Sequence, residues 1–145
     1  MTTLDWSEEI PFDESIIGNK VPRDAAGVYE FLQSEEYPRY QGSTRVLKIG
    51  MSKTDLRKEI MNHFQRHTVA NRLDRIRNIP KIKVSVKFAV VAVENATKIE
   101  DNLLREFEDK HWDLPVLNSQ RGYSRGEDKH YRTKKQQKNA SYILE

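Results

Sequence analysis

The sequence of 145 residues contains no cysteine and no long apolar run. The absence of cysteine excludes disulfide bonds and metal sites built from thiolates. No stretch reaches the about 18 apolar residues of a membrane-spanning helix, and no signal-peptide pattern stands at the amino terminus, so we expect no membrane partner. The protein is instead expected to be soluble and intracellular, either cytoplasmic or associated with the nucleoid. Its length and the lack of a central linker predict one domain.

Lysine and arginine are missing from residues 1–15, which hold five acidic residues, although the whole chain has a net charge of +3. The carboxyl end reverses this balance, because residues 121–138 carry seven Lys or Arg against two acidic residues, with two tyrosines between them. Such cations neutralise phosphates and release counterions without reading sequence. A solvated tail is the alternative. The cations expected to contact nucleic acid here are Arg121, Arg125, Lys129, Arg132, Lys134 and Lys135.

The pattern of apolar residues predicts an α/β protein. Residues 1–24 are broken by Pro11, Gly18 and Pro22 and are expected to form an irregular, partly docked segment. The rest of the chain predicts the order β, β, α, α, β, α, with the last strand in the centre of the sheet because it is β-branched and apolar. The predicted strands lie at 26–31, 46–52 and 84–93. The first predicted helix runs from a cap at Ser52 or Thr54 to about His67, and the second passes through Val69, Leu73 and Ile76 and ends before Pro80. The third helix follows a cap at Asn95 or Thr97.

Four short segments together carry a family resemblance. They are GVYEF at 27–31, LKIGMSKTDLRKEIMNHF at 47–64, KIEDNLLREF at 98–107 and PVLN at 115–118. In this order the sequence resembles the GIY-YIG nuclease superfamily over residues 25–120. The resemblance implies a small three-stranded antiparallel sheet flanked by helices. An extension at 1–24 would precede this domain, and the basic segment 121–145 would follow it.

The resemblance also implies a metal-dependent endonuclease that hydrolyses DNA phosphodiester bonds, with RNA left open as a substrate. Tyr29 matches the first motif tyrosine, Lys48 stands where the family has a second tyrosine, and Gly50 matches the motif glycine. A lysine beside Tyr29 would favour the phenolate form through its opposite charge. Glu100 matches the glutamate that binds the metal, here Mg²⁺ or Mn²⁺. The expected catalytic residues are Tyr29, Lys48, Arg57, His63, Glu100 and Asn118.

The family arginine has no match at its usual place, which is four residues before the histidine and on the same helix face. In this chain that position is Glu59, four residues before His63. Arg57 or Arg66 could serve the phosphate if the helix is oriented differently. A glutamate at the arginine position also favours an alternative function, namely a nuclease-like module that binds nucleic acid without cutting it.

The same helix has two other interpretations. If this chain is aligned to the family pattern from Gly50 without a gap, Lys58 lies close to the position of the family arginine. Glu59, His63 and His67 lie at i, i+4 and i+8, a spacing that can present ligands to a transition metal. Residues at this spacing are more often the solvated side of an amphipathic helix.

Further cations lie on and before the second predicted helix, whose outer face is basic. Arg66, Arg72 and Arg75 are therefore expected to contact nucleic acid together with the carboxyl-terminal cations. A third hypothesis is a structural or protein-interaction domain, in which Glu100 would lie far from Tyr29.

Removal of residues 121–145 is expected to weaken nucleic-acid binding and to flatten its dependence on salt, because several cations would no longer displace counterions. Sequence preference should change little. The measurement is the slope of the logarithm of the binding constant against the logarithm of salt concentration. An unchanged slope would show that this segment is only solvated and that Arg72, Arg75 and Arg77 hold the backbone instead.

Overall fold

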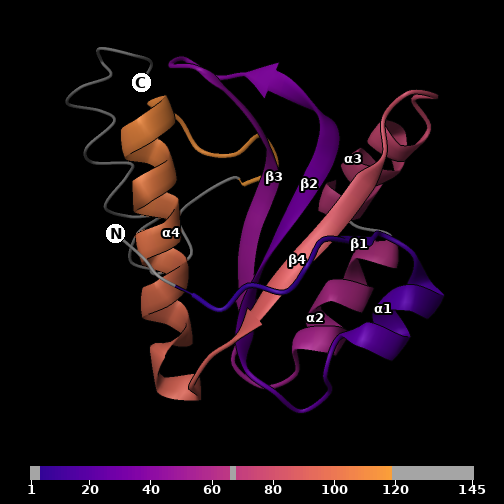
Figure 1. The fold of residues 1–145 in the computed structure, drawn as a ribbon, viewed down its shortest axis with the longest axis vertical. Coiled ribbons are helices and arrows are strands. Elements are labelled where there is room, and N and C mark those ends of the chain that lie inside the picture. Colours follow the sequence, from indigo (N-terminus) through magenta and orange to yellow (C-terminus); the bar gives the residue numbers. More distant parts are fainter. Residues whose placement is uncertain (1–3, 66–67, 119–145) are drawn as a thin grey trace.

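A four-stranded antiparallel sheet forms the middle of the protein in the computed structural model, which describes residues 4–65 and 68–118 (Figure 1). The strand order is β1-β4-β2-β3, and every neighbouring pair is antiparallel. The strands are β1 (Ile10–Pro11), β2 (Gly27–Pro38), β3 (Ser43–Ser52) and β4 (Val84–Val90). The predicted α/β class is confirmed, and β4 is an interior strand as expected.

Helices cover both faces of this sheet (Figure 1). The first three lie on one side and α4 lies on the other, with most of its sheet contacts on β3. The described helices are α1 (Glu14–Lys20), α2 (Leu56–Met61), α3 (Thr68–Arg77) and α4 (Ala96–His111), with 3₁₀ turns η1 (Asn62–Phe64) and η2 (Val93–Asn95).

The amino-terminal segment is docked, as expected, but it is not irregular throughout, because it contributes β1 and α1. Ile10 pairs with Val86, which adds a fourth strand to the three that were expected. Asp13 then caps α1 by accepting hydrogen bonds from the backbone nitrogens of Ser15 and Ile16 at 3.0 and 3.1 Å. These hydrogen bonds lower the pKa of the Asp13 carboxyl, and the one from the Ile16 backbone has the largest effect. Sequence reasoning gave too much weight to the prolines and too little to the Asp-Glu-Ser cap signal.

The helix after β3 is shorter than predicted. Asp55, and not Ser52 or Thr54, occupies the cap position and accepts a hydrogen bond from the backbone nitrogen of Lys58 at 3.1 Å. Ser52 instead accepts from the backbone nitrogens of Thr54 and Asp55 and shapes the turn that precedes α2. The helix ends at Met61 and tightens into η1, and α3 begins at Thr68.

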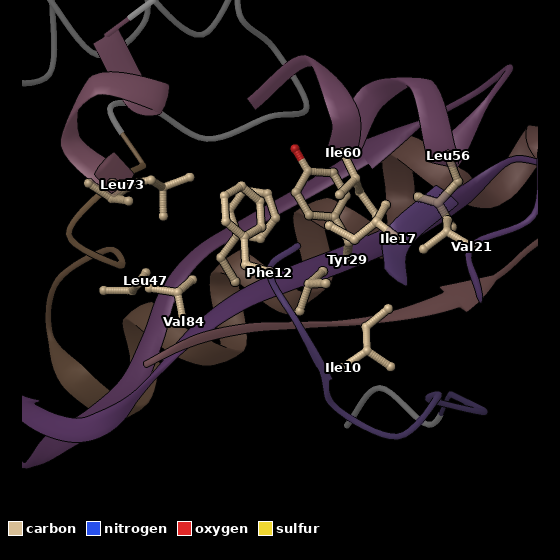
Figure 2. Packing of buried hydrophobic residues seen from close by; sticks show 13 residues of the cluster. Ile10, Phe12, Ile17, Val21, Tyr29, Leu47, Leu56, Ile60, Leu73 and Val84 are labelled. Carbon is tan, nitrogen blue, oxygen red and sulfur yellow. The ribbon is translucent and has the colours of Figure 1, made fainter. Parts of the chain in front are cut away.

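Alternation along β2 divides the protein interior into two hydrophobic clusters, because successive side chains of a strand point to opposite faces. Tyr29 and Phe31 belong to the cluster under the first three helices, where Figure 2 shows Tyr29 among its apolar neighbours. Val28 belongs to the second cluster, under α4, with Ile49 from β3. The sheet therefore has no solvated face along this part of β2, where residues 27–33 are all buried.

The longest described helix is α4, with 16 residues. Within residues 4–65 and 68–118, no helix is long and apolar enough to cross a membrane.

The Ile17→Ala variant is expected to lose about 2–5 kcal/mol of unfolding free energy, because Ile17 is fully buried in the cluster under the first three helices. The matched control is Ile79→Ala, because Ile79 is 46% exposed. The control should stay within about 0.5 kcal/mol of the unaltered protein. Chemical denaturation measures both. Equal losses in the two variants would show that α1 is not part of the core.

Candidate active site

Tyr29 stands at the centre of the candidate site. Its side chain is fully buried on the face of β2 that carries α2. Figure 2 shows the ring among apolar side chains, with the hydroxyl oxygen directed away from the strand. That hydroxyl donates a hydrogen bond to Oε2 of Glu59 at 3.0 Å. A strand residue and a helix residue thirty positions apart thus form one polar pair at the edge of an apolar cluster.

Gly50 makes the position of Tyr29 sterically feasible. The two residues are direct partners in the β2–β3 register. A Cβ atom on Gly50 would lie 2.3 Å from the Tyr29 hydroxyl oxygen and 2.4 Å from Cζ. No side chain larger than hydrogen fits there while the Tyr29 ring keeps its position. The motif glycine is explained by this close approach and not by a turn.

His63 is the third polar group of the site and lies on η1. It is 6% exposed, and its ring meets those of Tyr29 and Phe31 edge-on, with centroids 5.9 and 4.8 Å away. Its Nδ1 lies 3.0 Å from the backbone carbonyl oxygen of Glu59. Because a carbonyl oxygen only accepts, Nδ1 carries the hydrogen in this contact. In the neutral ring, Nε2 is then the nitrogen that can take up a proton.

Lys48 lies on the same face of the sheet as Tyr29. In the β2–β3 register Lys48 is the partner of Phe31, whereas Gly50 is the partner of Tyr29. Residues related in this diagonal way are within reach of long side chains. Lys48 is half-buried on β3, which is an edge strand. The structure thus brings a cation to the side of the sheet that carries the tyrosine.

Arg57 is directed toward α1. Its Nε donates a hydrogen bond to the carbonyl oxygen of Val21 at 2.7 Å, at the carboxyl end of that helix. This contact joins α1 to α2, and a role for Arg57 at a phosphate stays a prediction. The side chain one turn before His63 that reaches Tyr29 is Glu59. Lys58 is exposed.

Glu100 comes from α4, the helix on the other side of the sheet, so the structure does not bring this predicted site residue onto the face that carries Tyr29, Lys48 and His63. It is 1% exposed and lies on the buried stripe of α4 that also contains Leu103, Leu104 and Phe107. The chemistry of this group suits a hard divalent cation, because carboxylate oxygen is the ligand that Mg²⁺ and Mn²⁺ prefer. Among the described residues, no group of three His, Cys, Asp or Glu side chains could hold a metal ion. Any cation at Glu100 would therefore take most of its ligands from water and substrate.

Asn118 binds backbone. Its Oδ1 accepts from the nitrogen of Ile49 and its Nδ2 donates to the carbonyl oxygen of the same residue, both at 2.9 Å. The backbone nitrogen of Leu117 also donates to the carbonyl oxygen of Leu47 at 2.9 Å. These contacts satisfy polar backbone groups on the open side of edge strand β3. The position of Asn118 thus supports a role in holding the strand that carries Lys48 and Gly50.

Residues 27–137, more than half of the chain, match the T5orf172 domain family. The chain belongs to this family. The domain is found in some nuclease-like proteins, so a nuclease-like or DNA-associated role is the coarse functional expectation. Searches of curated proteins and of solved structures found no match.

The cations predicted to contact nucleic acid are only partly visible on this T5orf172 domain. Arg72 and Arg75 are exposed on α3. His67, proposed as a metal ligand with Glu59 and His63, lies outside the described residues. The cations outside the described residues are Arg66, Arg121, Arg125, Lys129, Arg132, Lys134 and Lys135.

Glu59 is the site residue whose role sequence reasoning missed. It was interpreted as a lost arginine, whereas the structure shows it as the acceptor for the Tyr29 hydroxyl. One signal was available, because Glu59 and His63 are four residues apart and share a helix face. That face could be recognised from spacing, but its contact with Tyr29 depends on how α2 packs on the sheet.

The Gly50→Ala variant is expected to lose about 1–3 kcal/mol of unfolding free energy, because the buried Tyr29 ring has to move away from the new methyl group. Gly18→Ala is the matched control. No atom lies within 4 Å of the added Cβ, and Gly18 is inside α1, so this variant should gain about 0.5–1 kcal/mol. Chemical denaturation compares the two. A fully stable Gly50→Ala protein would contradict the close approach of Tyr29 to this strand.

Proposed function

We propose that this T5orf172 domain is a metal-dependent endonuclease of GIY-YIG type that hydrolyses phosphodiester bonds of DNA. The supporting observation is the hydrogen bond from the Tyr29 hydroxyl to Glu59, beside the buried ring of His63. The pairing of β4 and β3 on either side of β2 is also consistent with the expected three-stranded motif, to which β1 adds a short edge strand. RNA remains a second candidate substrate.

Hydrolysis of a phosphodiester requires a group that accepts a proton from the attacking water. In our proposal the Tyr29 oxygen takes that proton while the hydroxyl hydrogen of Tyr29 passes to the Glu59 carboxylate. The water oxygen bonds to phosphorus as the bond from phosphorus to the leaving ester oxygen breaks, and that oxygen takes a proton from solvent. Tyr29 is then neutral before and after the transfer, and Glu59 ends protonated. This route requires no free phenolate in the resting enzyme. His63 offers a second acceptor through Nε2.

Positive charge is needed at the phosphate because the transition state gathers negative charge on the nonbridging oxygens. Lys48 supplies a cation on the face of the sheet that carries Tyr29. Its side chain is half-buried, and Leu117 and Asn118 cover the outer edge of β3 beside it, so a nucleic-acid backbone would have to approach Lys48 from the face of the sheet. In this proposal Lys48 replaces part of the charge that the family arginine would provide, and Arg57 or Arg66 could add to it.

Glu100 would hold the divalent cation, Mg²⁺ or Mn²⁺, which supplies charge neutralisation at the phosphate when bound. Glu100 lies on α4, and α4 contacts the sheet mainly through β3. Glu100 and Tyr29 lie on opposite sides of the sheet, and Leu117 and Asn118 cover the outer edge of β3 at Leu47 and Ile49, so a cation held at Glu100 would sit apart from the Tyr29 hydroxyl. Weak affinity for the free cation is expected, since Glu100 is the one carboxylate assigned to it.

A second candidate function is binding of nucleic acid without cutting. The observation that favours it is the same carboxylate, because Glu59 puts negative charge beside Tyr29, where a phosphate would have to approach. Repulsion between Glu59 and the phosphate would then limit the reaction. The exposed Arg72 and Arg75 could hold the backbone in either function.

The decisive experiment is a plasmid-nicking assay with Mg²⁺ or Mn²⁺ on three variants. Tyr29→Phe, Glu59→Gln and Glu100→Gln are each expected to reduce the cleavage rate by at least about a hundredfold with DNA binding retained, because each removes one proposed proton or metal group and preserves size. Cleavage that survives all three changes would overturn the proposed mechanism.

Matched controls separate this effect from general damage. Tyr40→Phe and Glu94→Gln change the same side-chain types at exposed positions and should cut normally. Glu59→Arg distinguishes the two candidate functions. A large gain in cutting by Glu59→Arg would show that the unaltered chain has a weakened site, and a loss would support Glu59 as the proton acceptor. Absence of cleavage by the unaltered protein would favour the binding module.

A further inference from the structure

A cavity of about 220 Å³ lies beside the candidate site, between α3, η1 and Phe12. His63 lines both the cavity and the Tyr29–Glu59 cluster, so the two are adjacent. Its volume is below the roughly 300–1,000 Å³ of most small-molecule pockets. A ligand of one or two fused rings fits such a volume better than an extended chain.

The cavity has an aromatic wall. Phe12 and Phe64 stack with ring centroids 4.3 Å apart and an angle of 9° between their planes. Phe12 is buried, whereas Phe64 is only half-buried and lines the cavity. The guanidinium carbon of Arg77 lies 5.2 and 5.6 Å from the two ring centroids. A flat π-system placed here would meet an aromatic ring and a guanidinium group, both of which stack on nucleobases.

The rim of the cavity is polar and carries both hydrogen-bond donors and acceptors. Gln65 and Asn71 supply amides, Asp74 a carboxylate and Arg77 a guanidinium. Asp74 and Arg77 are 4.0 Å apart, so their charges partly cancel. The carboxylate at the rim would repel a bare phosphate. A purely apolar ligand would leave the four polar groups without hydrogen-bond partners in the cavity. Mixed donors and acceptors around an aromatic wall match the edge of a nucleobase.

We propose that this cavity binds one nucleobase of the substrate strand, taken out of its stack, next to the phosphate held at Tyr29. The link to cleavage rests on the proposed endonuclease function, whereas base binding itself does not. The cavity would take an unpaired or displaced base, because a base inside a duplex cannot enter a pocket of this size. Asn71 would read the base edge and Phe64 would provide the stacking surface.

The test titrates the full-length protein with the four deoxynucleosides and, as a phosphate probe without a base, with deoxyribose 5-phosphate. Backbone amide signals followed by NMR should shift around Phe64 and Asn71 with at least one nucleoside and not with the sugar phosphate. Phe64→Leu and Asn71→Ala should each weaken the binding about tenfold, by loss of stacking and of a hydrogen bond respectively. Asn78→Ala, an exposed asparagine just after the same helix, is the matched control and should bind as the unaltered protein does.

The outcomes separate this inference from the proposed function. Nucleoside binding at the cavity without any DNA cleavage would support the inference and count against the endonuclease. Cleavage of DNA with no nucleoside response near Phe64 and Asn71 would overturn the inference and leave the endonuclease intact. Equal weakening by Asn71→Ala and Asn78→Ala would also overturn it, provided that thermal unfolding shows all variants folded.

Discussion

The pairing of β2 with β3 is the constraint on which the rest of the molecule depends. It places Tyr29 opposite Gly50, and the missing side chain leaves the volume that the tyrosine ring needs. The same register directs Val28 and Ile49 to the other face, where α4 packs on them. One alternation along β2 therefore positions the candidate site on one side of the sheet and half of the hydrophobic core on the other. A shift of one residue would exchange the two faces.

Charge at the candidate site is arranged differently from the GIY-YIG pattern that the sequence resembles. The Glu59 carboxylate accepts a hydrogen bond from the Tyr29 hydroxyl, at the position where the GIY-YIG pattern has an arginine. An arginine would carry positive charge toward a substrate, whereas Glu59 accepts a hydrogen bond from the neutral Tyr29 hydroxyl. Lys48 places a positive charge on the face of the sheet that carries Tyr29.

The acidic amino-terminal segment has uses within the fold. Glu9 accepts two hydrogen bonds from Arg45 of β3, at 2.7 and 3.0 Å, and the Arg45 guanidinium lowers the pKa of that carboxyl. On the same face, Glu30 lies 3.6 Å from Lys87. Burial raises the pKa of Glu30, and Lys87 acts against that rise. The Glu9–Arg45 pair joins β3 to the segment before β1, on the opposite edge of the sheet. The uneven charge seen in the sequence thus partly reflects structure and not only partners.

Local patterns were enough to predict most elements, because strand alternation, helix periodicity and chain order depend on neighbours in sequence. The interior β4, the two motif strands and the long final helix follow from such patterns. The short β1 could not be predicted, since two residues become a strand only when β4 is there to pair with them. The relation of Tyr29 to Glu59 and Gly50 likewise arises from tertiary packing, because residues 21 to 30 positions away meet Tyr29 only after α2 and β3 have docked on β2. The sequence by itself determined which residue types were present, and the tertiary structure alone decided which of them share a hydrogen bond.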